Sequence, residues 1–103
     1  METENKCTVV ITATFKEGGK ETPEFKEYSE RSNANGEAHG GVVVAKHMVE
    51  QNLGDGEALP HLVLIVEYPS KEKAIETFTN QEYLSIVPLR QVALKEVNIL
   101  ITK

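Results

Sequence analysis

The chain alternates between segments whose hydrophobic pattern repeats every two residues and segments whose pattern repeats every three to four. Residues 7–15 are apolar or β-branched at almost every position and run up to Gly18–Gly19, so they predict a first strand. Residues 42–51, 61–68 and 96–102 share the period of two and predict three more strands.

The predicted strands differ in how buried they should be. The segment 42–51 carries charges, and its period of two puts His47 on the face of Val43 and Lys46 on the other, which favours an edge or interface strand. The segment 61–68 is apolar on both faces apart from Glu67, which is typical of a central strand.

Helices are predicted after three residues whose side chains can cap a first turn. Thr22 is followed by Pro23, and this helix should fade near residues 33–36. Ser70 precedes a second apolar stripe, and Asn80 begins a further helical segment that Pro88 should bend or end.

The order of these elements is strand, helix, strand, strand, helix, strand. With right-handed crossovers, this order predicts an α+β, ferredoxin-like βαββαβ fold with a four-stranded antiparallel sheet and helices on one face. The 103 residues fit a single domain, 1–103, in which residues 1–6 are expected to be flexible. Because the strands 7–15 and 61–68 look apolar or β-branched on both faces, we expect a homodimer through the uncovered sheet face.

The charge and the cysteine content exclude some kinds of partner and some kinds of site. The chain has 11 basic and 16 acidic residues, a net charge of −5, which argues against nucleic acid or an anionic membrane as partners. A single cysteine, Cys7, excludes an intramolecular disulfide and a cysteine-built zinc site. The polar, acidic N-terminus does not resemble a secretory signal, so the expected location is the cytoplasm.

Several short strings resemble signature stretches of a family of unknown function, the domain of unknown function numbered 1330. They are Val-Glu-Tyr-Pro-Ser at 66–70, Asn-Gln-Glu-Tyr at 80–83 and Pro-Leu-Arg at 88–90, within a resemblance that covers residues 7–103. The resemblance implies a small dimeric α+β-barrel protein. Leu62 stands where many relatives carry arginine.

Glu67 and Arg90 are the first candidates for chemistry. A carboxylate in phase with Val63 and Ile65 at the end of a central strand would have a raised pKa if buried, which suits a general base. Arg90, one of two arginines, can clamp a substrate carboxylate. Both residues have a structural interpretation as well, as a buried ion pair with each other.

Tyr28, Tyr83 and His47 are the candidates for a substrate pocket. Each tyrosine sits on the inward face of a predicted helix, where it either donates to a bound carbonyl or simply packs its ring. His47 is a candidate pocket base. The three histidines lack metal-binding spacing, and neither glycine pair forms a phosphate loop, so no metal or cofactor is expected.

Two functions therefore stay open at the level of sequence. Other dimeric α+β-barrel families include cofactor-free monooxygenases and lactone isomerases, and by that analogy Glu67 would accept a proton from a small organic acid or carbonyl compound. The alternative is a non-catalytic metabolite-binding or interaction module in which Glu67 and Arg90 form a structural ion pair.

Overall fold

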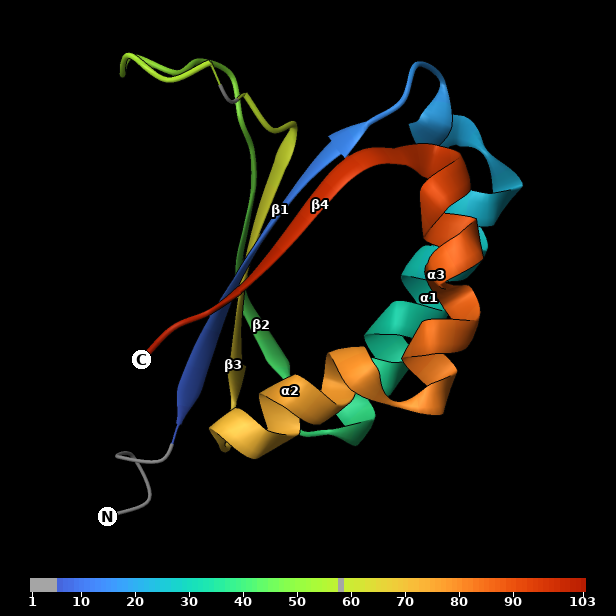
Figure 1. Ribbon diagram of the computed structural model, residues 1–103, viewed down its shortest axis with the longest axis vertical. Helices are drawn as coiled ribbons and strands as arrows, with labels where there is room; N and C mark the ends of the chain where they lie inside the picture. The colour runs from blue at the N-terminus through green and yellow to red at the C-terminus, as the bar shows by residue number, and fades with distance from the viewer. Residues whose placement is uncertain (1–5, 58) are drawn as a thin grey trace.

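The protein folds into one sheet and one layer of helices. The computed structural model describes residues 6–57 and 59–103, so the predicted flexibility of the N-terminal segment falls, except at Lys6, outside the described residues. The strands lie along one side of the molecule and the helices along the other (Figure 1). The elements in chain order are β1 (Cys7–Phe15), η2 (Gly19–Glu21), α1 (Pro23–Ala38), β2 (Val42–Met48), β3 (Leu62–Tyr68), α2 (Lys71–Thr79), α3 (Gln81–Ala93) and β4 (Leu94–Ile101).

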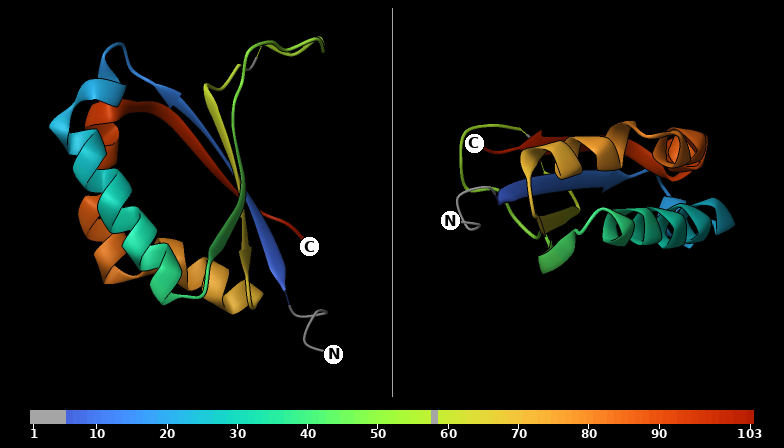
Figure 2. Two further views of the ribbon diagram at one scale, coloured as in Figure 1. Left: turned by 180° about the vertical axis from the view of Figure 1, so that it is seen from behind. Right: turned by 90° about the horizontal axis from the view of Figure 1, so that it is seen from below.

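The strand order confirms the predicted ferredoxin-like fold. The sheet runs β2-β3-β1-β4 with antiparallel neighbours, which places β1 and β3 in the centre and β2 at an edge, as expected. All three α-helices cover the same face of the sheet (Figure 2). We call that face the inner face and the opposite one the outer face. No helix in the described part of the chain is long and apolar enough to cross a membrane.

The three predicted helix caps are confirmed. The side chain of Thr22 accepts a hydrogen bond of 3.1 Å from the backbone N–H of Phe25. Ser70 caps α2 and Asn80 caps α3 in the same way. Each cap satisfies a backbone donor that the first turn of a helix leaves without a partner, which is why these helices start where they do.

One helix end differs from the prediction, and of the two alternatives for Pro88 the structure excludes a helix end. The first helix continues past residues 33–36 to Ala38, because Asn35 is buried there and bonded to another helix, so tertiary contacts outweigh its low helix propensity. Pro88 does not end α3, which runs on to Ala93. Proline removes one backbone hydrogen bond, and here the flanking turns hold the helix together without it.

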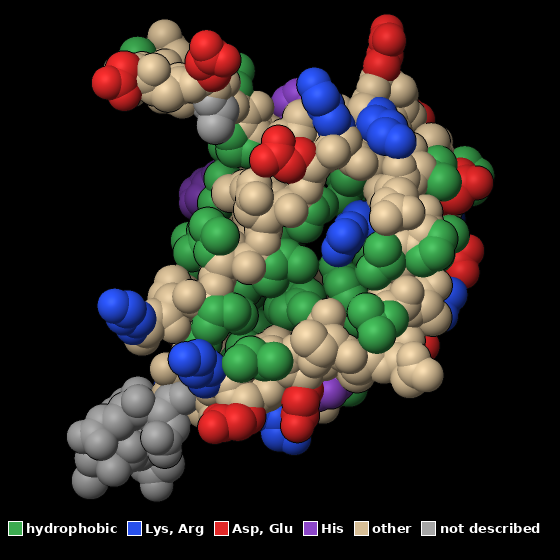
Figure 3. Space-filling view, viewed as in Figure 1, with side chains coloured by type: hydrophobic (Ala, Val, Ile, Leu, Met, Phe, Trp, Pro, Cys, Tyr) green, Lys and Arg blue, Asp and Glu red, His purple; other side chains and the backbone are tan. Residues whose placement is uncertain are grey.

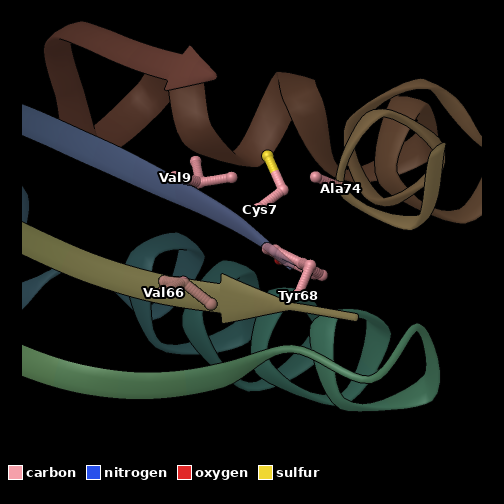
Figure 4. Packing of buried hydrophobic residues seen from close by; sticks show 5 residues of the cluster. All are labelled: Cys7, Val9, Val66, Tyr68 and Ala74. Carbon is pink, nitrogen blue, oxygen red and sulfur yellow. The ribbon is translucent and has the colours of Figure 1, made fainter. Parts of the chain in front are cut away.

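The core lies between the sheet and α2, with a second cluster at the far end of α3. In Figure 4 the buried side chains of β1 and β3 meet Ala74 of α2. The first cluster consists of Cys7, Val9, Val66, Tyr68 and Ala74. The second consists of Ala13, Ala93 and Leu94, at the junction of α3 with β4.

Two glycines allow the ends of α1 to come close to the rest of the fold. Gly19, just before α1, packs so tightly that a Cβ atom there would overlap the backbone carbonyl of Ala93. Gly41, just after α1, would place a Cβ atom 2.7 Å from Cε1 of Tyr68. Both distances are shorter than side chains tolerate, so α1 is fixed at its two ends by positions without a side chain.

A polar joint connects α1 to the corner between α2 and α3. The buried side chain of Asn35 donates a hydrogen bond of 2.7 Å to the carbonyl of Thr77 and accepts one of 2.9 Å from Nδ2 of Asn80. Asn80 also contacts Nε2 of His39, whose Nδ1 lies 2.8 Å from the carbonyl of Asn35. Three segments far apart in the sequence are thus held together by one side chain.

Candidate functional site

A cleft separates the helix layer from the inner face of the sheet. It has a part of about 250 Å³ that is the more enclosed of the two, called the enclosed part below, and a wider, more open part of about 650 Å³. Hydrophobic side chains gather around the hollow between sheet and helices (Figure 3). The two parts adjoin because both are lined by Ile11, Ser32, Asn33, Val43, Leu64 and Phe78.

Alternation along the central strands makes the floor of the cleft apolar. Ile11 of β1 and Leu64 of β3 lie opposite each other in the register and both line the cleft. Side chains point to alternate faces along a strand, so every second residue of β1 and β3 contributes to this floor. Phe25 and Phe78 close it from the helix side.

A β-bulge in β2 changes which of its side chains face the cleft. Val43 pairs with Val66, whereas Ala45, two positions on, pairs with the next residue, Ile65. Val44 is therefore an extra residue in the strand. An extra residue inverts the alternation of all side chains that follow it.

The bulge brings Lys46 into the cleft and removes His47 from it. Lys46 pairs with Leu64 and lines the enclosed part. His47 pairs with Val63 on the outer face. The prediction that His47 shares the face of Val43 is wrong, because strict alternation was assumed through the three valines at 42–44.

The wall formed by α1 is the polar side of the cleft. Tyr28, Ser29, Ser32 and Asn33 recur at helical spacing and line the enclosed part. Glu37, one turn further on, lines the wider part. Among the described residues that line the cleft, Lys46 is the cation and Glu37 is the carboxylate. Neither residue was singled out from the sequence, since nothing in the local pattern placed them near a cavity.

The structure brings together three of the predicted site residues. Nη1 of Arg90 donates a hydrogen bond of 2.9 Å to the hydroxyl of Tyr83, which is 2.8 Å from the hydroxyl of Tyr28. The guanidinium carbon also lies 5.9 Å from the centre of the Tyr83 ring. Tyr83 and Arg90 come from α3 and Tyr28 from α1, so the chain of hydrogen bonds crosses between the two helices.

Tyr28 is kept in its neutral form. Burial is the main cause that raises the pKa of its phenol above the ordinary value. The charge of Arg90 and a hydrogen bond with Ser32 lower this pKa, but burial outweighs both. At neutral pH Tyr28 is therefore a hydrogen-bond donor at the wall of the cleft and not a base.

Glu67 lies away from the other candidates. Its neighbours Val66 and Tyr68 are buried on the inner face, so Glu67 points to the outer face, where it pairs in the register with Thr8 and Val42. Arg90 lies in the helix layer, on the opposite side of the sheet. The proposed ion pair between Glu67 and Arg90 is therefore not formed within the chain.

The described residues do not suggest a metal centre. Within residues 6–57 and 59–103, no three His, Cys, Asp or Glu side chains come together in a group that could hold a metal ion.

Solved structures share this fold at low sequence identity. A protein of unknown function from Rhodopseudomonas palustris superimposes with a TM-score of 0.78 at 24% identity, over 97% of this chain and 82% of its own. The Arabidopsis thaliana protein At3g17210 gives 0.62 at 17%, over 94% and 93%. The cofactor-independent oxygenase SnoaB from Streptomyces nogalater gives 0.60 at 14%, over 96% and 94%. At these identities the likeness establishes the fold alone.

The sequence matches a protein family over most of its length, although no curated protein matches it. The match covers residues 15–103, and the family is described as Domain of unknown function (DUF1330). This agrees with the resemblance seen in the short strings around residues 66–70, 80–83 and 88–90. The chain belongs to the DUF1330 family.

Proposed function

We propose that the protein binds a small, largely apolar organic acid or carbonyl compound in the cleft and acts on it without a cofactor. The observation that carries this proposal is a partly enclosed apolar space of about 250 Å³ that is lined by one cationic residue, Lys46. A ligand for this space is smaller than drug-sized molecules, whose pockets measure roughly 300–1,000 Å³.

The lining specifies what kind of ligand fits. Ile11, Leu64 and Phe78 offer an apolar surface for a ring or a short aliphatic chain. A cation beside such a surface favours a carboxylate, a phenolate or an enolate, because an anion there loses water and gains a charge-assisted bond.

The cleft also supplies groups for proton transfer. Glu37 is positioned on the wider part as a proton acceptor, and Lys46 stabilises the oxyanion that remains after an acidic C–H or O–H is deprotonated. In an isomerase the proton returns at another carbon of the enolate. In an oxygenase the enolate carbon forms a C–O bond with dioxygen, the co-substrate and oxidant, and the peroxide oxygen takes up the abstracted proton to give a hydroperoxide. SnoaB, a cofactor-independent oxygenase with the same fold, supports this class.

Binding of benzoate and its neutral analogue benzamide tests the cleft. Lys46→Met should weaken benzoate binding about tenfold and leave benzamide binding nearly unchanged, as measured by ligand-observed NMR. Lys95→Met is the matched control, since Lys95 is exposed on β4 and does not line the cleft. Equal affinities of both variants for benzoate would refute the role of Lys46. Native mass spectrometry of protein purified without denaturation would identify a natural ligand.

We further propose that the working unit is a homodimer through the outer face of the sheet. Val10, Val63 and Ile65 lie on that face by the register of β1 and β3, and Leu100 of β4 is 51% exposed. Such a row of apolar side chains is costly in water and is covered in an assembly. Leu100→Glu should give a monomer in light scattering, whereas Leu84→Glu, equally exposed on α3, should leave the dimer intact. A monomeric wild type would overturn this proposal.

A further inference from the structure

The hydrogen bonds among Arg90, Tyr83 and Tyr28 have a defined direction. A guanidinium group has donors and no acceptor, so Arg90 donates and the oxygen of Tyr83 accepts. Of the described residues, Arg90 and Tyr28 are the hydrogen-bond partners of the Tyr83 hydroxyl. The first bond in the chain therefore has only one possible donor.

The second bond follows from the burial of Tyr83, which is 2% exposed. A buried hydroxyl hydrogen without an acceptor costs free energy, and native structures nearly always avoid this. Since Arg90 cannot accept, the hydrogen of Tyr83 must go to the oxygen of Tyr28, 2.8 Å away. The oxygen of Tyr28 is then an acceptor in this bond, and its own hydrogen is left to donate elsewhere.

The hydroxyl hydrogen of Tyr28 is available for donation into the cleft. Tyr28 and Ser32, one turn apart on α1, both line the enclosed part, and Lys46 lines it from β2. Their two hydroxyl groups therefore belong to the same wall. The hydroxyl of Tyr28 can therefore donate to an acceptor oxygen of a ligand that Lys46 holds.

We infer that Tyr28 donates a hydrogen bond to the carbonyl or oxyanion oxygen of the cleft ligand and that Arg90, acting through Tyr83, is the positioning residue that keeps Tyr28 turned as a donor. This inference rests on the proposed function of the cleft and specifies its ligand class. The site selects compounds with an acceptor oxygen next to a small apolar body, and it favours the ionised form of a phenol or enol. Arg90 does not itself contact the ligand in this arrangement.

The probe for this inference is 4-nitrophenol, whose visible spectrum reports whether the bound phenol is ionised. Wild-type protein should bind the phenolate in preference to the phenol and lower the pKa of the probe. Tyr28→Phe should weaken phenolate binding about tenfold, since a hydrogen bond to a charged oxygen is lost. Arg90→Met should have a similar effect, because Tyr28 is then free to turn its hydrogen toward Tyr83. Arg90→Lys, which keeps a donor without an acceptor, should restore part of the affinity.

A double-mutant cycle separates positioning from a general structural effect. If Arg90 acts through Tyr28, Arg90→Met should change phenolate affinity in the wild type but not in the Tyr28→Phe background. Arg31→Met is the matched control: Arg31, the second arginine, pairs with Glu27 and Glu82 on the helix surface and should not affect the probe. Urea unfolding of each variant verifies that the protein is folded at the temperature of the titration.

Each outcome has a distinct meaning. Equal losses from Arg90→Met in both backgrounds would overturn the role of Arg90, and unchanged phenolate affinity in Tyr28→Phe would overturn the role of Tyr28. If Lys46→Met weakens the binding of 4-nitrophenolate while the Tyr28 and Arg90 variants do not, this inference fails and the proposed function stands. If neither the wild type nor any variant binds the probe, both fail.

Discussion

Replacing Asn35 with alanine should loosen the joint between α1 and the α2–α3 corner. In the wild type, Asn35 donates to the carbonyl of Thr77, one of the last carbonyls of α2, which lack partners within their own helix. Its oxygen accepts from the side chain of Asn80, which caps α3. The substitution therefore affects all three α-helices at once.

The size of the effect follows from these two bonds. A buried carbonyl without a partner costs about 1–3 kcal/mol, and the loss of the bond to Asn80 adds about 0.5–1.5 kcal/mol. Alanine has a higher helix propensity than asparagine, which returns roughly 0.6 kcal/mol. The free energy of unfolding should therefore fall by about 1–4 kcal/mol, with a midpoint of about 2.5 kcal/mol, a large share of the roughly 5–15 kcal/mol typical of a domain. The melting temperature should fall by about 10–20 °C.

Asn33→Ala is the matched control, because Asn33 is exposed two positions earlier on the same helix and gains the same propensity. Urea unfolding at a fixed protein concentration gives the free energy of each variant, and an unchanged m-value shows that the two can be compared. Asn35→Ala should be less stable than Asn33→Ala by about 1.5–4.5 kcal/mol, because the propensity gain is common to both variants. A difference below about 0.5 kcal/mol, the scale of ordinary surface substitutions, would refute the reasoning.

Two further predictions concern packing and alkaline pH. Gly41→Ala should destabilise the protein by about 1–3 kcal/mol, because its Cβ atom would lie 2.7 Å from the ring of Tyr68. The control is Gly56→Ala, whose Cβ atom meets nothing within 4 Å and which should have the melting temperature of the wild type. Burial raises the pKa of Tyr28 above the ordinary value of 10.0, so the stability that its neutral form contributes is complete below pH 10 and is lost as the pH rises toward the raised pKa. Urea unfolding on either side of pH 10 should therefore show a smaller loss of stability for Tyr28→Phe than for the wild type, and equal losses would contradict the assignment.

Much of the fold could be predicted because its signals are local. In residues 7–15, threonine alternates with apolar residues, so both the strand and its bounds were predicted correctly. Thr22, Ser70 and Asn80 were identified as caps because a short polar side chain before an apolar stripe acts within one helical turn.

The cleft could be predicted only in part, because its geometry depends on one residue and on long-range packing. The three valines at 42–44 carry no phase, so the sequence does not reveal which of them is the extra residue of the bulge, and Lys46 and His47 exchange faces as a result. The contact of Tyr28 with Tyr83 depends on how α1 packs against α3, 55 residues apart in sequence.

Glu67 shows a different limit of prediction from sequence. Its phase with Val63 and Ile65 is evident in the sequence, but these residues lie on the outer face, and the helices cover the other face. The pattern of a strand that is apolar on both sides does not reveal which side the helices cover.

The tight contacts of Gly19 and Gly41 fix the two ends of α1. The residues that hold the scaffold are therefore different from those that face the ligand. Gly19 and Gly41 tolerate almost no change, since any side chain there would push α1 away from its neighbours. Lys46, an exposed residue of the edge strand β2, lines the cleft and can vary without moving them. Gene duplicates of such a chain can therefore diverge in ligand preference by a few substitutions while inheriting the scaffold unchanged, and a change of substrate need not begin with a loss of stability.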